Sequence, residues 1–235
     1  MRVSLEADLE GSLLRRYQRF FADVALADGR VLTVHCPNPG SMLGCATPGA
    51  RVRCSTSESP TRKLAHTLEM IRVGRAWVGL HTTRANQLVA AALAARRLPF
   101  LEGYATVRRE AAAGDGARLD FRLDDHASDP RPAWVEVKSV TLAAGRLARF
   151  PDSVTERGRR HLETLAKLRA RGERALLLFV VQRADCDRVE PADDLDPAYG
   201  RALRAAAAGG VELRAIRARV SPRALALEGE LPVLL

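Results

Sequence analysis

Short stretches of alternating apolar and polar residues, separated by turn residues, make up the first third of the chain. Such alternation predicts β-strands, expected here over residues 13–26, 31–36, 50–55, 63–73 and 76–81. Asp28-Gly29 favours a hairpin turn, and Asn38-Pro39-Gly40-Ser41 favours a second turn. Short strands with glycine-rich corners indicate a small β-barrel of the OB type, with a β-sandwich as the alternative.

The pattern changes near residue 84 to helical and strand segments that alternate along the chain. Helices are predicted over residues 86–97, 155–171 and 197–208, and strands over 104–110, 119–123, 134–142, 176–181, 211–220 and 224–227. The segment 176–181 is apolar throughout, which is typical of a strand covered on both faces. We therefore expect two domains, residues 1–83 and 84–235, the second an α/β mixed sheet flanked by helices.

The composition narrows the class of partner. The 235 residues include 37 Lys and Arg against 28 Asp and Glu, which gives a formal net charge of +9. A basic chain favours a polyanion, with nucleic acid ahead of an anionic membrane surface. An arginine-rich composition bias is the alternative explanation.

The cysteines and the N-terminus bear on the compartment. Cys36, Cys45, Cys54 and Cys186 form no Cys-x-x-Cys pair and are expected to be buried free thiols. No apolar run is long enough to span a membrane, and acidic residues stand where a signal peptide would be apolar. We expect a cytoplasmic protein with no membrane partner. A homodimer is one option for its oligomeric state.

Two neighbouring predicted strands carry a candidate metal site. Asp120 lies in the strand 119–123, and Glu136 and Lys138 lie in the next strand. Because strands alternate their faces, pairing would place all three side chains on one side of the sheet. Two carboxylates, with the Val137 carbonyl as a further ligand, suit Mg²⁺ or Mn²⁺. A solvent-exposed charge cluster is the alternative.

Lysine is scarce in this chain, which makes Lys138 informative. Only three of the 37 basic residues are Lys, at positions 63, 138 and 167. Lys carries a compact charge whose pKa shifts readily, whereas Arg stays protonated. Lys138 is therefore a candidate to position the attacking water or to stabilise charge on a phosphate, alongside Asp120 and Glu136 as catalytic residues. Chance placement of three Lys is the alternative.

Two further sets of residues are candidates for nucleic-acid contacts. Thr155 or Ser153 is expected to cap the helix 155–171, whose free N–H groups suit a phosphate, and Glu156 or Arg157 could reach the metal site. An ordinary capped helix start is the alternative, and His161 within this helix is expected to be structural. On the barrel, a groove for a nucleic-acid backbone is predicted from Arg51, Arg53, Arg62 and Lys63, with Arg72, Arg75 and the aromatic Trp77 nearby. A solvated charged face explains this set equally well.

Taken in order, several segments resemble the sugar fermentation stimulation protein A family. They include His35-Cys36-Pro37-Asn38-Pro39-Gly40-Ser41, Val135-Glu136-Val137-Lys138 and residues 19–24, 62–64, 77–79, 118–121, 150–158, 196–199 and 231–234. The resemblance implies an N-terminal OB-fold and a C-terminal PD-(D/E)xK nuclease-like domain. It also implies non-specific DNA binding and a proposed regulatory role in maltose metabolism. Asp120, Glu136 and Lys138 match its nuclease-type positions.

One departure from the family pattern concerns the helix 86–97. The family often has a Glu there, near the positions of Ala90 and Ala91, and this chain lacks that auxiliary metal ligand. The leading hypothesis is a DNA-binding protein, with RNA as a second nucleic-acid option, that carries Mg²⁺-dependent phosphodiesterase chemistry. Its binding is expected to be salt-sensitive and sequence-tolerant. The alternatives are a non-catalytic DNA-binding regulator on a nuclease scaffold and an enzyme acting on a small phosphorylated or nucleotide substrate.

Overall fold

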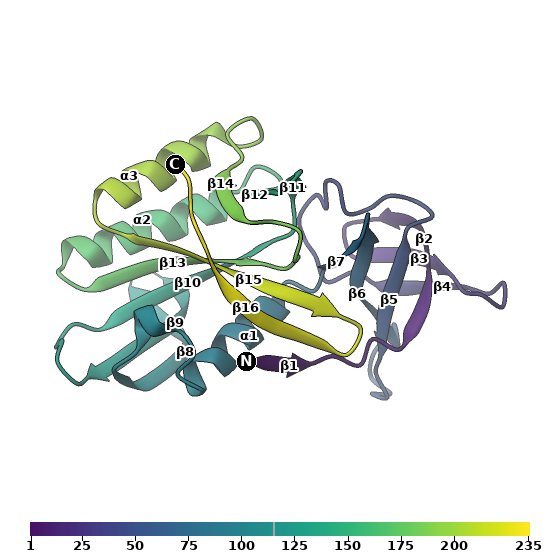
Figure 1. Cartoon of the computed structure of the whole chain (residues 1–235), viewed down its shortest axis with the longest axis horizontal. Coiled ribbons are helices and arrows are strands. Elements are labelled where there is room, and N and C mark those ends of the chain that lie inside the picture. Colours follow the sequence, from purple (N-terminus) through teal and green to yellow (C-terminus); the bar gives the residue numbers. More distant parts are fainter. Residues whose placement is uncertain (115) are drawn as a thin grey trace.

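The computed structural model describes residues 1–114 and 116–235. Figure 1 shows a small barrel of strands beside a broad sheet, with α2 and α3 running next to each other over the sheet. In the described residues there are three α-helices, α1 (Thr83–Ala94), α2 (Glu156–Ala170) and α3 (Pro197–Ala208). None of the helices in these ranges is long and apolar enough to cross a membrane.

The barrel is built from the strands that alternate most clearly in the sequence. It consists of β2 (Leu9–Tyr17), β3 (Phe21–Ala25), β4 (Val31–His35), β5 (Arg51–Thr56), β6 (His66–Val73) and β7 (Ala76–Gly79), in the order β4-β3-β2-β5-β6-β7. A parallel bridge between His35 and Thr67 joins β4 to β6 and closes the barrel. Leu13, Val24, Val52 and Ile71 belong to its fully buried core. The expected OB-type barrel is confirmed.

The second sheet is mixed, with parallel strands at its centre. Its order is β1-β16-β15-β13-β10-β9-β8, and β10, β13 and β15 run parallel. The strands are β1 (Arg2–Ser4), β8 (Tyr104–Gly114), β9 (Ala117–His126), β10 (Ala133–Val140), β13 (Arg174–Val181), β15 (Glu212–Ser221) and β16 (Ala224–Leu231). A separate small sheet contains β11 (Ala143–Ala144), β12 (Leu147–Phe150) and β14 (Arg188–Pro191), and the sequence pattern did not predict it.

Helices cover both faces of the mixed sheet, as the apolar run of β13 predicted. Alternate residues of this strand face opposite layers. Leu176, Leu178 and Val180 belong to the core that contains α1, whereas Leu177, Phe179 and Val181 belong to the core that contains α2 and α3. An α/β domain with a mixed sheet flanked by helices is therefore confirmed.

Two local differences from the sequence prediction have simple causes. The predicted single strand 13–26 is two strands, because the chain reverses at Gln18 and Arg19, whose φ angles are positive. No Gly or Pro marks this turn. The other difference is β1, which pairs with β16 in the mixed sheet instead of joining the barrel. Residues 2–4 therefore leave the predicted domain 1–83, and the division at residues 83 and 84 remains our proposal.

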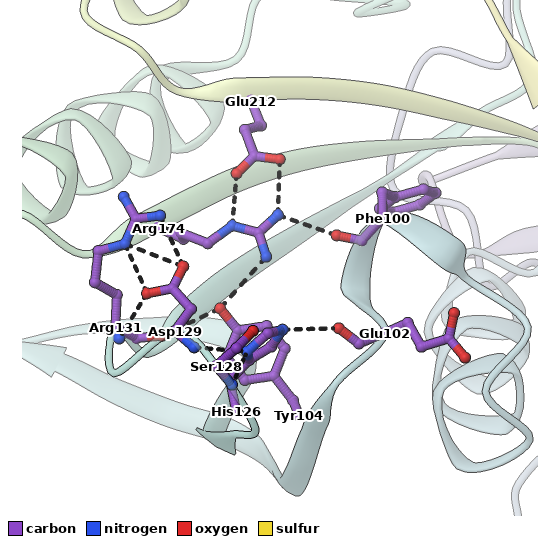
Figure 2. A network of polar contacts seen from close by, with 9 residues as sticks. All are labelled: Phe100, Glu102, Tyr104, His126, Ser128, Asp129, Arg131, Arg174 and Glu212. Atoms are coloured by element: carbon purple, nitrogen blue, oxygen red, sulfur yellow. Dashed lines mark hydrogen bonds and ion pairs between the residues drawn. The ribbon is translucent and has the colours of Figure 1, made fainter.

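A polar network lies at the end of the mixed sheet where β13 and β15 begin, near the loop 127–132 (Figure 2). Arg174 forms a two-pronged ion pair with Glu212, at 2.9 and 3.0 Å, and also donates to the Phe100 carbonyl. The Tyr104 hydroxyl donates to the Arg131 carbonyl at 3.1 Å. The Arg174 pKa is raised, first by its hydrogen bond to Glu212. These contacts join β13 and β15 to the segments that surround β8.

Candidate metal centre

A cavity of about 560 Å³ lies between the barrel and the mixed sheet. The barrel contributes Arg19 and the turn 38–40, and the start of α1 contributes Thr82, Thr83 and Asn86. The remaining wall comes from β9, β10, the segment 149–155 and the start of α2. Asp120, Glu136 and Lys138 all line this interdomain cavity, together with Val137.

Asp120 lies where β9 separates from β10. Their ladder ends at the pair Phe121 and Val135, and beyond it the Asp120 carboxylate accepts the Val137 N–H at 2.7 Å. The Asn86 side-chain amide on α1 donates to the other carboxylate oxygen at 2.5 Å. Burial, followed by the nearby negative charge of Glu136, raises the pKa of Asp120 to about 6. A cation placed here would remove this conflict between neighbouring carboxylates.

Glu136 is buried and already surrounded by basic side chains. Its Oε1 accepts a hydrogen bond from Lys138 Nζ at 2.8 Å and a short one from His161 Nδ1. Burial alone would raise the pKa of Glu136, but the His161 hydrogen bond and the Lys138 charge outweigh it and lower that pKa. Glu136 is therefore ionised, and Lys138 lies directly beside it.

The two carboxylates reach the cavity from different sides of the sheet. Asp120 contacts Asn86 of α1, whereas Glu136 contacts His161 of α2, and these helices pack on opposite faces. Simple alternation along paired strands therefore does not describe the site. Leu119 also packs in a different core from Phe121, because β9 turns away from β10 at this point. The separation of the strands opens the space between the carboxylates.

The carboxylates of Asp120 and Glu136 fit a hard divalent ion, although they are few in number. Among the described residues the hydrogen bonds to Glu136 go to Oε1, and the negative charge of Glu136 acts on the nearby Asp120 carboxyl. Carboxylate oxygens are the ligands that Mg²⁺ prefers. No group of three or more His, Cys, Asp or Glu suited to a metal occurs in the described part of the chain. A metal here would rely on two carboxylates completed by neutral oxygens.

The predicted helix start beside the cavity is more specific than the sequence suggested. Thr155, not Ser153, caps α2, because its hydroxyl accepts the Gly158 N–H at 3.1 Å. Thr155 and Arg157 both line the interdomain cavity, and Arg157 Nε donates to His161 Nε2 at 3.4 Å. Arg157 thus approaches the metal centre through His161. Glu156 is exposed and does not line the cavity.

The basic residues predicted on the barrel lie outside this cavity. Arg51 and Arg53 both form ion pairs with Glu10, which offsets part of their charge. Arg62 is exposed and donates to Thr67 Oγ1 at 2.8 Å, and Lys63 is exposed. Their role in nucleic-acid binding remains a prediction.

Three residues at the site were not predicted to take part in it. Asn86 takes the α1 position that faces Asp120, one turn before Ala90, so the helix contributes an amide where we looked for a missing carboxylate. His161 was expected to be structural, yet it hydrogen-bonds Glu136. A His one helical turn after Arg157 was the available signal.

Asp152 is the third such residue, and it joins the two halves of the cavity. Its carboxylate accepts the Met42 N–H at 3.0 Å, and its carbonyl accepts the Ser41 hydroxyl. A Cβ on Gly40 would lie 2.5 Å from this carboxylate, so a larger residue there would displace the Asp152 side chain. The Asn-Pro-Gly-Ser turn of the barrel is therefore a docking turn for the loop before α2.

Comparisons with known proteins agree with this architecture. The family described as SfsA N-terminal OB domain matches residues 14–80, and the one described as Sugar fermentation stimulation protein RE domain matches residues 83–224. A sugar fermentation stimulation protein homolog of Halorhodospira halophila is 53% identical over 95% of this chain and 94% of its own length. Its homolog in Geobacter metallireducens is 48% identical over 96% of both.

A solved structure extends the similarity to three dimensions. The SfsA protein of Pyrococcus furiosus, in complex with Ca²⁺, matches with a TM-score of 0.86 and 27% identity over 97% of this chain and 96% of that one. The fold defines a protein with an OB barrel followed by an α/β domain of the kind that the family description calls an RE domain. With matches of this extent, the chain belongs to the sugar fermentation stimulation protein A family.

Proposed function

We propose that this protein binds DNA and hydrolyses its phosphodiester backbone with Mg²⁺ or Mn²⁺ in the interdomain cavity. The observation that carries the proposal is that Asp120, Glu136 and Lys138 line one cavity at the junction of the barrel and the nuclease-like domain. The Ca²⁺ complex of the Pyrococcus furiosus relative supports a divalent ion in this fold. The excess of positive charge, +9, supports a polyanionic substrate.

Each residue of the site has a distinct role in this proposal. Asp120, Glu136 and the Val137 carbonyl hold the ion, which would neutralise the scissile phosphate and make water a better nucleophile. Lys138 orients that water or stabilises the negative charge that develops on the phosphoryl oxygens. The water oxygen bonds to phosphorus and releases a proton to solvent, one P–O ester bond breaks, and the departing alkoxide takes up a proton from solvent, which leaves a phosphate monoester and an alcohol.

A test should measure metal binding and turnover separately. Titration calorimetry with Mg²⁺ and Mn²⁺ should detect an ion in the wild type that Asp120→Asn and Glu136→Gln no longer bind. Asp8→Asn removes an exposed carboxylate and serves as the matched control. Equal binding by all four proteins would exclude the site. Cleavage of duplex DNA should likewise be retained by the wild type and Asp8→Asn and lost in Asp120→Asn and Glu136→Gln.

A second candidate function is a non-catalytic DNA-binding regulator on the same scaffold. The observation that favours it is the small donor set, in which Asn86 faces Asp120 and no third acidic or His ligand joins the cluster within the described residues. The role in maltose metabolism implied by the family resemblance would then rest on binding alone. DNA binding without divalent binding or cleavage would decide for this candidate.

A further inference from the structure

A second cavity, of about 470 Å³, continues from the metal centre along α2. We call it the α2 groove, and it shares Arg157 and His161 with the interdomain cavity. The other wall is the turn at the start of β9, which contributes Gly116, Ala117 and Arg118. The α2 groove is therefore adjacent to the interdomain cavity, with Arg157 and His161 at their common border.

The α2 groove carries positive charge that no ion pair among the described residues neutralises. Arg118, Arg157 and Arg160 line it, all three are exposed, and none forms an ion pair with a carboxylate of residues 1–114 or 116–235. Glu163 is the one carboxylate among the described lining residues. On the barrel, by contrast, Arg51 and Arg53 share Glu10. Exposed arginines without an ion-pair partner among the described residues therefore lie along α2, next to the candidate metal site.

The side chains of the α2 groove match a phosphate backbone better than exposed bases. No aromatic residue is among the described residues that line it, whereas single-strand sites use aromatic rings to stack bases. Arg157, Arg160, Thr164 and Lys167 follow helical spacing along one face of α2. From position 157 to 167 the helix rises about 15 Å, which corresponds to roughly four base pairs of duplex.

We propose that the α2 groove binds the backbone of duplex DNA flanking the scissile phosphate, with Arg118 and Arg160 as phosphate contacts. This inference rests on the proposed function, whose substrate is duplex DNA. It moves the main phosphate contacts away from the barrel residues Arg51 and Arg53. It also predicts that roughly four base pairs on one side of the cleavage point contribute to affinity.

Salt-dependent DNA binding, measured in EDTA so that no cleavage occurs, tests the proposal. The variants are Arg118→Ala with Arg160→Ala, Arg51→Ala with Arg53→Ala, and the control Arg201→Ala with Arg223→Ala. Each pair removes two positive charges, so an effect of net charge alone would be equal in all three. Five of the six arginines are exposed and Arg53 is half-buried, and unfolding followed by circular dichroism checks that each variant is folded.

The expected result is specific to the first pair. Losing two phosphate contacts should reduce the slope of log K against log salt by about 1.8 and weaken binding about 60-fold at 0.1 M salt. The control pair should change affinity less than about threefold. An unchanged slope for Arg118→Ala with Arg160→Ala, or an equal loss in the barrel pair, would overturn the assignment while leaving duplex binding intact. A wild type that does not bind duplex DNA at low salt would instead refute the proposed function.

Discussion

Asp120→Asn should make the metal-free protein more stable, because the native carboxylate is held against its preference. Folding raises the pKa of Asp120 from 3.8 to about 6, first through burial and then through Glu136. At about 1.4 kcal/mol for each pKa unit, the ionised carboxylate costs about 3 kcal/mol at neutral pH. Asn accepts the Val137 N–H less well than a carboxylate does, and this weaker hydrogen bond cancels about 1 kcal/mol of the stability gain. A gain of about 2 kcal/mol is expected.

The difference in unfolding free energy between Asp120→Asn and the wild type should depend on pH. Between 3.8 and about 6 the folded state binds more protons than the unfolded state, so the penalty fades as the pH falls. The stability gap between Asp120→Asn and the wild type should therefore be nearly complete at pH 7. Near pH 5 the carboxylate penalty drops to about 1.6 kcal/mol, which leaves a gap of about 0.6 kcal/mol after the weaker hydrogen bond is subtracted.

Urea unfolding in EDTA at pH 7.5 and pH 5.0, followed by circular dichroism, measures the gap. Asp8→Asn is the control, because an exposed carboxylate should change the free energy of unfolding by less than about 0.5 kcal/mol. Adding Mg²⁺ should stabilise the wild type and leave Asp120→Asn unaffected. The reasoning fails if Asp120→Asn is no more stable than the wild type at pH 7.5, or if the gap does not depend on pH.

Three further substitutions test other parts of the account. Lys138→Ala should lower the cleavage rate by about 10² to 10³ with DNA affinity nearly unchanged, and Lys138→Arg should also be poor; full turnover by Lys138→Arg in a single-turnover assay would contradict the argument from lysine scarcity. Gly40→Ala should cost about 1 to 3 kcal/mol of unfolding free energy because its Cβ meets Asp152, whereas Gly229→Ala meets no atom within 4 Å and should cost less than about 1 kcal/mol; equal losses in urea unfolding would argue against the docking turn. Arg174→Lys should lose the bidentate ion pair with Glu212 and lower the free energy of unfolding by about 1 to 2 kcal/mol, with cleavage unchanged. Reduced cleavage at unchanged stability would show that the network in Figure 2 acts on the site instead.

Local signals in the sequence predicted the elements whose causes are local. The helix at Pro197 began where expected, since Asp196 accepts the Tyr199 N–H and Pro stands in the first turn. The continuous apolar run of β13 likewise predicted that this strand is buried on both faces. The Gln18-Arg19 turn was missed because neither residue is a usual turn former.

Features that depend on distant parts of the chain were beyond local pattern. The pairing of β1 with β16 joins opposite ends of the sequence, and nothing in residues 2–4 indicates it. The sequence predicted Asp120 and Glu136 on one face of the sheet, whereas the structure brings them to one cavity from opposite faces, where β9 separates from β10. Asn86 and His161 reach the carboxylates from helices on opposite faces, an arrangement that only the packed sheet defines.

The central claim is that a divalent ion binds between Asp120 and Glu136. Crystals grown above pH 7, where the Asp120 carboxyl is ionised, can be soaked in Mn²⁺ and examined by anomalous diffraction. One strong anomalous peak is expected in the interdomain cavity, within coordination distance of both carboxylates and the Val137 carbonyl, and it should be lost in Asp120→Asn. An empty cavity at saturating Mn²⁺, or a peak that remains unchanged in Asp120→Asn, would contradict the central claim.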